Sequence, residues 1–308
     1  MIITFHTIME KSSRILDPEI LARFGNISLV AKTIVEGFIS GLHRSIHKGA
    51  SIEFAEHRQY SVGDDPKYLD WKVYGRTDRL YIREFREETN LKSYILLDSS
   101  NSMNYSSQPD TITTKFIYAK CLAICLSYIM MKQNDSTGLV IFDSEIQNFI
   151  KPSSTRQHFH FLIENIENTE AGKDTDIGKT IHKIANLIKR RSLIILISDL
   201  FDDQDAVIKG LAHFKHKHHE IIVFHLLDKA EIEFPFEGFK DFIDMETNER
   251  IPVDVRAIRN TYRNVFNQFL SFYQKACSER DINYARALTS MPFDYFLYHF
   301  LQLRSRPT

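Results

Sequence analysis

Cysteine is scarce in this sequence, with three residues in 308, at positions 121, 125 and 277. A sparse and odd number of cysteines argues against a framework of disulfide bonds and for a reducing compartment. Cys121 and Cys125 are four residues apart in an apolar stretch, so they share one face of a predicted helix. They could form a redox or metal-binding pair, but the favoured interpretation is two small residues of the core.

A large net charge is also missing, because Lys and Arg number 39 and Asp and Glu number 40. The sequence has no overall attraction to nucleic acid or anionic membranes, although a local basic patch stays possible. The most apolar long stretch, residues 117–131, is interrupted by Lys120 and is too short to span a bilayer. The N-terminus lacks the basic start, apolar run and cleavage site of a signal peptide. We expect a cytoplasmic protein with no membrane span and no nucleic acid partner.

From residue 91 onward the sequence alternates regularly between short apolar strands and helices. Strands are predicted at 94–97, 138–142, 146–150, 193–197, 221–227 and 282–287, and helices at 113–133, 156–166, 177–190, 203–216, 255–279 and 293–303. Such alternation indicates a mostly parallel sheet covered on both faces. The strand 146–150 is expected to form a hairpin with 138–142. The predicted fold is therefore α/β, with a doubly wound, Rossmann-like, mostly parallel six-stranded sheet and one antiparallel edge strand.

Two other regions depart from this alternation. Residues 231–254 interrupt it, and a small inserted hairpin of 242–246 and 250–253 is predicted there. Residues 1–90 are expected to form a separate N-terminal segment that packs on the main domain, 91–308, with a helix at 17–42 followed by loops and short strands. Its many charges and the only tryptophan, Trp71, leave two interpretations open: a second interaction surface or clamp, or a salt-bridged structural cap anchored by Trp71.

Acidic and hydroxyl side chains follow two of the predicted apolar strands. Asp98 ends one strand and begins the loop Asp98-Ser99-Ser100-Asn101-Ser102, and Ser198-Asp199 ends another. Ligands of doubly wound sheets bind beyond the carboxyl ends of the strands, so both carboxylates are expected on one rim. Two close carboxylates need a cation or a shared proton, and the neighbouring hydroxyls favour a hard cation such as Mg²⁺. A later loop, residues 172–176, could add the Thr175 hydroxyl.

The same residue types have an ordinary structural use. Asp and Ser after a strand are common turn and N-cap residues, and Asp-x-Ser-x-Ser occurs often by chance. The combination favours a metal site, because the loop at Asp98, then Thr175, then Asp199 occur in the expected order. The interpretation requires that these oxygens lie together and that no lysine fills the open position of the metal.

This combination resembles the von Willebrand factor A family and its metal-ion-dependent adhesion site, over about residues 91–290. The resemblance implies that Ser100 and Ser102 bind Mg²⁺ or Mn²⁺ (Ca²⁺ being a further candidate) directly. Asp98, Thr175 and Asp199 would act directly or through water. It also implies one open coordination position, which the carboxylate of a protein partner fills.

The segment before Asp98 carries a second resemblance. Its motifs are Gly49-x3-Glu53-Phe54, Arg58-x-Tyr60, Gly63-Asp64-Asp65, Asp70-Trp71-Lys72 and Gly75-Arg76. They resemble a bacterial family catalogued as domain of unknown function fifty-eight, in which this segment directly precedes an A-type domain. Ser51 and Lys67 depart from the glycine and arginine usual in that family. The resemblance implies an adaptor or assembly factor, with a MoxR-type AAA+ ATPase as a partner.

We therefore expect a metal-dependent protein-binding module and not an enzyme. The alternative is a Mg²⁺-dependent phosphohydrolase or phosphotransferase with Asp98 as nucleophile, although Ser100 stands where such enzymes usually have a second aspartate. A purely structural module is the third possibility. The cluster His213, His216, His218 and His219 could bind a transition metal, but it reads more simply as the cationic end of a helix and the following loop.

Overall fold

The computed structural model describes residues 53–61, 69–86, 92–107, 114–172, 176–245, 249–292, 295–297 and 299–300. The chain divides into two compact units, one formed by residues 43–91 and the other containing Lys92 and the residues after it. The predicted helix at 17–42 lies outside the described residues. The prediction that residues 1–90 pack on the main domain stays a prediction.

The smaller unit is built on an antiparallel pair, β1 (Glu53–Gln59) and β2 (Tyr81–Arg86), with the short helix α4 (Trp71–Thr77) between them. Asp70 begins this helix by accepting hydrogen bonds from the backbone N–H groups of Lys72 and Val73. Trp71 is 63% exposed, so it does not anchor a buried core in this unit as one interpretation required.

The main unit contains a six-stranded sheet with the strand order β10-β7-β6-β3-β4-β5. Its strands are β3 (Lys92–Asp98), β4 (Ser136–Phe142), β5 (Ile146–Ser153), β6 (Leu193–Ser198), β7 (Glu220–Leu227) and β10 (Asn283–Leu288). All neighbours pair in parallel except β4 and β5. The predicted doubly wound sheet with one antiparallel edge strand is confirmed.

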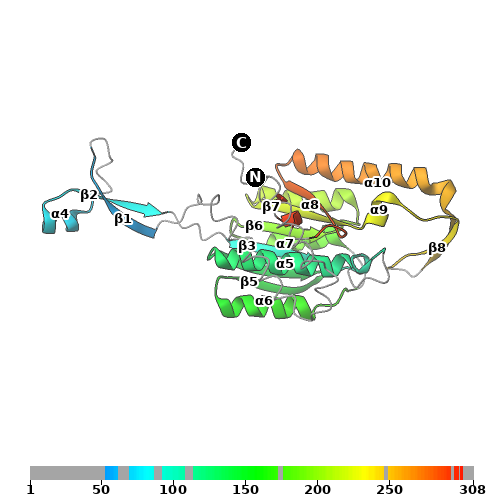
Figure 1. Ribbon diagram of the computed structural model, residues 1–308, viewed down its shortest axis with the longest axis horizontal. Helices are drawn as coiled ribbons and strands as arrows, with labels where there is room; N and C mark the ends of the chain where they lie inside the picture. The colour runs from blue at the N-terminus through cyan, green and yellow to red at the C-terminus, as the bar shows by residue number, and fades with distance from the viewer. Residues whose placement is uncertain are drawn as a thin grey trace, which may run out of the picture. The chain divides into compact units, whose positions relative to one another are not determined.

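Helices cover the sheet, and in Figure 1 α10 and α6 lie at opposite margins of the main unit with strands between them. The helices are η2 (Asn101–Asn104), α5 (Lys115–Lys132), α6 (Arg156–Asn168), α7 (Ile177–Leu187), α8 (Gln204–His216), α9 (Lys229–Glu233) and α10 (Val255–Ser278). Tyr94 and Leu96 of β3 belong to one apolar core with α7, α8 and α10. Ile95 and Leu97 point to the opposite face and are also buried. Burial on both faces explains why β3 reads as a continuous apolar run.

The inserted hairpin exists, but its first strand was placed too late. It consists of β8 (Phe239–Ile243) and β9 (Arg250–Asp254), whereas the sequence predicted 242–246 for the first strand. Gly238 adopts a φ of +70° and its carbonyl accepts the N–H of Val255. Because this hydrogen bond joins the two ends of the hairpin, the first strand begins at residue 239. Residues 246–248, between the two strands, lie outside the described residues.

Helices α7 and α8 pack closely at Gly178. A Cβ atom there would lie 2.6 Å from the Cβ of Ala206 and 2.9 Å from its carbonyl carbon. We expect Gly178→Ala to lower the free energy of unfolding by about 1–3 kcal/mol, because the contact is with backbone that has no room to move. Urea denaturation followed by far-ultraviolet circular dichroism measures this. Gly75→Ala is the control, since no atom lies within 4 Å of its added Cβ. Equal stability of Gly178→Ala and the native chain would contradict the packing described.

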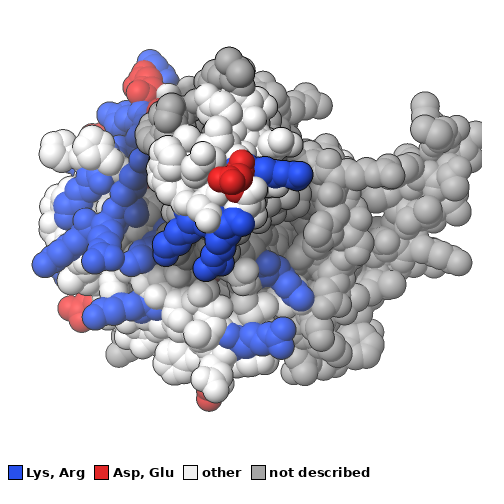
Figure 2. All heavy atoms as spheres, turned by 90° about the vertical axis from the view of Figure 1, so that its left-hand side faces the viewer, with Lys and Arg blue, Asp and Glu red and all other residues white. Residues whose placement is uncertain are grey.

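Charge is distributed unevenly in spite of the near-zero total. Many Lys and Arg side chains are visible on the face that Figure 2 shows. Within the main unit, Lys183 lies exposed in α7, and Lys189, Arg190 and Arg191 lie exposed between α7 and β6. No described carboxylate forms an ion pair with these four residues. The local basic patch that the composition left possible is therefore present.

Among the described helices, none is long and apolar enough to cross a bilayer.

Candidate metal centre

Asp98 ends β3 and is fully buried. One carboxylate oxygen accepts the backbone N–H of Ser100 at 2.9 Å, and the other accepts the hydroxyl of Ser198 at 2.5 Å. Ser198 belongs to β6, the parallel neighbour of β3. The carboxylate is therefore fixed by its own loop and by the next strand, at the carboxyl-terminal edge of the sheet.

The hydroxyls of Ser100 and Ser102 lie side by side, with 3.1 Å between their oxygens. Ser100 stands at the N-cap of η2 but makes no side-chain capping bond. Ser99 between Asp98 and Ser100 points elsewhere, since its hydroxyl donates to the carbonyl of Phe142 at 3.0 Å. Adjacent ligands of an octahedral Mg²⁺ at about 2.1 Å are separated by about 3 Å. The two hydroxyls thus have the spacing of neighbouring ligands of one ion.

Asp199 follows β6 and is fully buried at the same edge of the sheet. Burial raises the pKa of Asp98 to about 7, with the nearby charge of Asp199 as the second cause, while hydrogen bonds from Ser198 and Ser100 oppose the rise. Among the described residues, no cationic side chain pairs with Asp98. The two strand-end carboxylates are close, as the sequence predicted, and Asp98 has no positive charge paired with it.

Sequence reasoning missed Lys115, the first residue of α5. Its ammonium donates to Asp199 Oδ2 at 2.7 Å and to Glu231 Oε1 at 2.6 Å, and only 1% of the side chain is exposed. Burial lowers the pKa of Lys115, but the attraction of Asp199 and Glu231 outweighs it and raises the pKa. A positive charge in the first turn of a helix interacts unfavourably with the helix dipole. The position of Lys115 at the start of a predicted helix was therefore the feature of the sequence that could have indicated an acidic partner.

The position of Lys115 tests the requirement, stated from the sequence, that no lysine fills the open position of the metal. Its described hydrogen bonds go to Asp199 and Glu231, and none goes to Asp98, Ser100 or Ser102. Asp199 keeps its second oxygen, Oδ1, which accepts the N–H of Phe201 at 3.3 Å. Lys115 therefore occupies one oxygen of Asp199, a predicted ligand. It does not bond to the side-chain oxygens of Asp98, Ser100 and Ser102, which remain available to a cation.

Thr175, the fifth predicted ligand, lies outside the described residues. The residue that precedes this gap, Gly172, donates its N–H to the carbonyl of Ser99 at 2.5 Å. A Cβ at Gly172 would approach Asp143 Oδ2 to 2.3 Å and the carbonyl oxygen of Ser99 to 3.3 Å, so a side chain there would displace the Asp143 carboxylate. The loop that leads to Thr175 is therefore fastened to the loop of Asp98, Ser100 and Ser102.

These observations test whether a divalent cation suits the site. A buried carboxylate without a cationic partner, two hydroxyls at ligand spacing and a second carboxylate on the next strand form a hard, oxygen-only donor set. This is the donor set that Mg²⁺ and Mn²⁺ prefer. Asp98, Ser100 and Ser102 fit such an ion, and Asp199 fits it with one oxygen already bound to Lys115.

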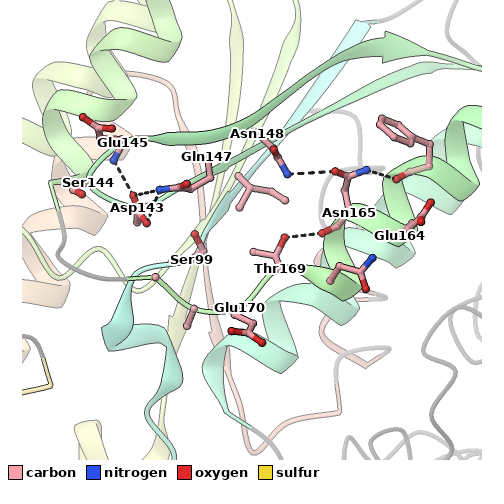
Figure 3. Close-up of a pocket in the computed structure, with 15 residues that line it drawn as sticks. Ser99, Asp143, Ser144, Glu145, Gln147, Asn148, Glu164, Asn165, Thr169 and Glu170 are labelled. Carbon is pink, nitrogen blue, oxygen red and sulfur yellow. Dashed lines mark hydrogen bonds between the residues drawn. The ribbon is translucent and has the colours of Figure 1, made fainter.

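A groove of about 860 Å³ flanks the loop (Figure 3). Ser99 and Gly172 line its end next to the loop, and β5 and α6 form its sides. Four carboxylates line it, from Asp143, Glu145, Glu164 and Glu170, and no described Lys or Arg does. Asp143 is held by both Gln147 and the N–H of Glu145. The groove adds negative potential beside the candidate cation site.

The inserted hairpin also reaches this loop. The side-chain amide of Asn101, which lies between the two serines, donates to the carbonyl of Met245 just after β8. The insertion also supplies Glu231, whose Oε2 accepts the N–H of Asp228 in a capping box while Oε1 binds Lys115. The region that interrupts the strand and helix alternation therefore helps to build the site.

Two other groups considered from the sequence have structural roles. Cys121 and Cys125 are buried in α5, and burial raises the pKa of Cys121 to about 12, as expected for core thiols. His213 and His216 lie in the last turn of α8, where their positive forms suit the helix dipole. Among the described residues, no cluster of three or more His, Cys, Asp or Glu has a metal-binding arrangement.

Comparisons with known proteins identify the family of this chain. The model of the family described as "Protein of unknown function DUF58" matches residues 56–268. The uncharacterized protein Rv1480 of Mycobacterium tuberculosis is 23% identical over 227 residues, which cover 72% of this chain and 69% of that protein. An uncharacterized protein of Mycobacterium bovis, Mb1516, matches to the same extent.

Solved structures with similar folds include two with von Willebrand A-like architecture. The conserved hypothetical protein BatB from Bacteroides thetaiotaomicron has a TM-score of 0.47 and 15% identity, and it covers 70% of this chain and 100% of its own. The VWA domain of SpRpn10 has a TM-score of 0.42 and 14% identity, with 67% and 93% covered. The family match spans well over half of the chain and confirms the resemblance of its signature segment. The chain belongs to the DUF58 family.

Proposed function

We propose that this chain is a divalent-metal-dependent protein-binding module. In this proposal Asp98, Ser100 and Ser102 hold Mg²⁺ or Mn²⁺, Asp199 assists through Oδ1, the oxygen that Lys115 does not bind, or through water, and Thr175 completes the set. A carboxylate of a protein partner takes the open coordination position. The ion would supply a fixed positive charge at the rim of the sheet, and the chain's own residues hold and orient it.

One observation supports this proposal most. The Oγ atoms of Ser100 and Ser102 lie 3.1 Å apart beside a fully buried carboxylate that has no described cationic partner. A buried unpaired carboxylate is costly, and a divalent cation would remove that cost. Helix capping does not explain the position of the Ser100 hydroxyl, because that side chain makes no capping bond.

Phosphoryl transfer from Asp98 is less well supported. A nucleophile must reach the phosphorus atom of its substrate, whereas Asp98 is fully buried. We therefore propose a binding role without catalysis.

For the partner, the family resemblance supports a MoxR-type AAA+ ATPase, with this chain as its cytoplasmic adaptor or assembly factor. Affinity capture from native cells tests both points, with Mg²⁺ in one sample and a chelator in the other, read by mass spectrometry. We expect capture of the ATPase with Mg²⁺ and its loss with chelator. Capture that is indifferent to the chelator would contradict metal dependence.

A matched pair of serine variants sharpens this capture experiment. Ser102→Ala removes one proposed ligand and should lose the partner even with Mg²⁺ present. Ser99→Ala removes a neighbouring hydroxyl that bonds to the sheet instead, and it should keep the partner. Equal capture by the two variants would contradict the role of Ser102 as a ligand of the ion that the partner requires.

A further inference from the structure

The side chain of Lys115 is almost completely buried. It is 1% exposed, its ammonium lies 2.7 Å from Asp199 Oδ2 and 2.6 Å from Glu231 Oε1, and the ring centroid of Phe201 lies 4.7 Å away. Glu231 is itself fixed, because its other oxygen accepts the N–H of Asp228 at 2.7 Å. The lysine thus links the loop after β6 to helix α9, which follows β7.

The charges of the site can be compared with and without this lysine. The ammonium of Lys115 pairs with Asp199 and Glu231, and Asp98 is a third carboxylate that interacts with Asp199, so the site carries two net negative charges when all three are ionised. A divalent cation balances that charge. Without Lys115 the net negative charge is three, and Asp199 Oδ2 is free to face the ion. Buried opposite charges at these distances attract each other strongly. The ammonium of Lys115 must therefore weaken the attraction of these carboxylates for a second cation.

We propose that Lys115 is a resident counter-ion that competes with the divalent cation for Asp199. It keeps the site folded when no metal is bound, and it limits how tightly the metal binds. This inference rests on the proposed function, because it presupposes that Asp98, Ser100 and Ser102 can hold a divalent ion. It goes further in assigning to a lysine of α5 the control of the affinity for that ion.

Titration of the full-length chain with Mn²⁺, with free Mn²⁺ counted by electron paramagnetic resonance, tests the proposal. Lys115→Met and Lys115→Gln should each bind Mn²⁺ about tenfold or more tightly than the native chain, because each removes the competing charge. Lys120→Met is the matched control. It removes a lysine of the same helix whose ammonium bonds to the carbonyls of Glu167 and Thr169, so the affinity should not change.

The outcomes separate this inference from the proposed function. If the native chain binds Mn²⁺ and both Lys115 variants bind it equally or more weakly, the counter-ion role is wrong and the metal site stands. If only the variants bind Mn²⁺, the counter-ion role is supported and the native chain is not metal-dependent. If no protein binds Mn²⁺, both proposals fail.

A measurement on the native chain avoids dependence on variants that fail to fold. The chain is labelled with ¹³C in lysine and titrated with diamagnetic Mg²⁺. The Cε resonance of Lys115, assigned as the signal missing from whichever variant folds or by sequential assignment, should shift in step with Mg²⁺ binding. Mg²⁺ binding without any shift of that resonance would overturn the competition.

Discussion

Replacing Asp98 by asparagine is expected to weaken Mn²⁺ binding by about 100-fold or more. Asparagine keeps the shape of the side chain but removes the charge that attracts the ion, and Asp98 is the buried carboxylate that no described cation neutralises. Titration with Mn²⁺, followed by electron paramagnetic resonance or calorimetry, gives the affinities of the variant and the native chain.

The control for this variant is Asp143→Asn. Asp143 also follows a strand of the same sheet and is also buried, but its carboxylate is held by Gln147 and by the N–H of Glu145. Its replacement should change Mn²⁺ affinity little. Equal losses in the two variants would mean that general negative potential, and not ligation by Asp98, attracts the ion.

Replacing Lys115 by alanine is expected to lower the free energy of unfolding of the metal-free protein by about 3–5 kcal/mol. The large effect follows from what remains, since Asp199 and Glu231 would stay buried without the ammonium that pairs with both. Urea denaturation in the presence of chelator, followed by circular dichroism, measures the loss.

An exposed ion pair provides the comparison. Lys179 pairs with Asp176 at 2.7 Å, but its side chain is 79% exposed, so Lys179→Ala should change stability little. Adding Asp199→Asn to Lys115→Ala should restore part of the lost stability, because it removes one of the unpaired charges. A loss with Lys115→Ala no greater than that with Lys179→Ala would contradict the buried pairing described here.

The strands β3, β4, β6 and β7 of the main sheet were predictable because they are buried on both faces. Runs such as Tyr94–Leu97 and Leu193–Ile197 have no polar residue, and only a covered parallel sheet tolerates that. The place of Asp98 and Asp199 followed from the same reasoning, because neighbouring parallel strands end at one rim. Pattern and topology together therefore brought the two carboxylates into one site.

What the sequence did not reveal depends on contacts between distant residues. Lys115 and Asp199 are 84 positions apart, and Glu231 lies in an insertion that looked like an interruption of the fold. The start of β8 was misplaced because it depends on the closure between Gly238 and Val255, which apolar periodicity does not report. The near-zero net charge likewise concealed the basic patch between α7 and β6.

The central claim is that the loop from Asp98 to Ser102 binds a divalent cation, and anomalous diffraction from crystals grown with Mn²⁺ tests it most directly. We predict a single strong peak about 2.1–2.3 Å from the hydroxyl oxygens of Ser100 and Ser102, with Lys115 close to Asp199 and one coordination position open to solvent. A peak elsewhere, or no peak while the ammonium of Lys115 fills the space between Asp98 and Asp199, would contradict it.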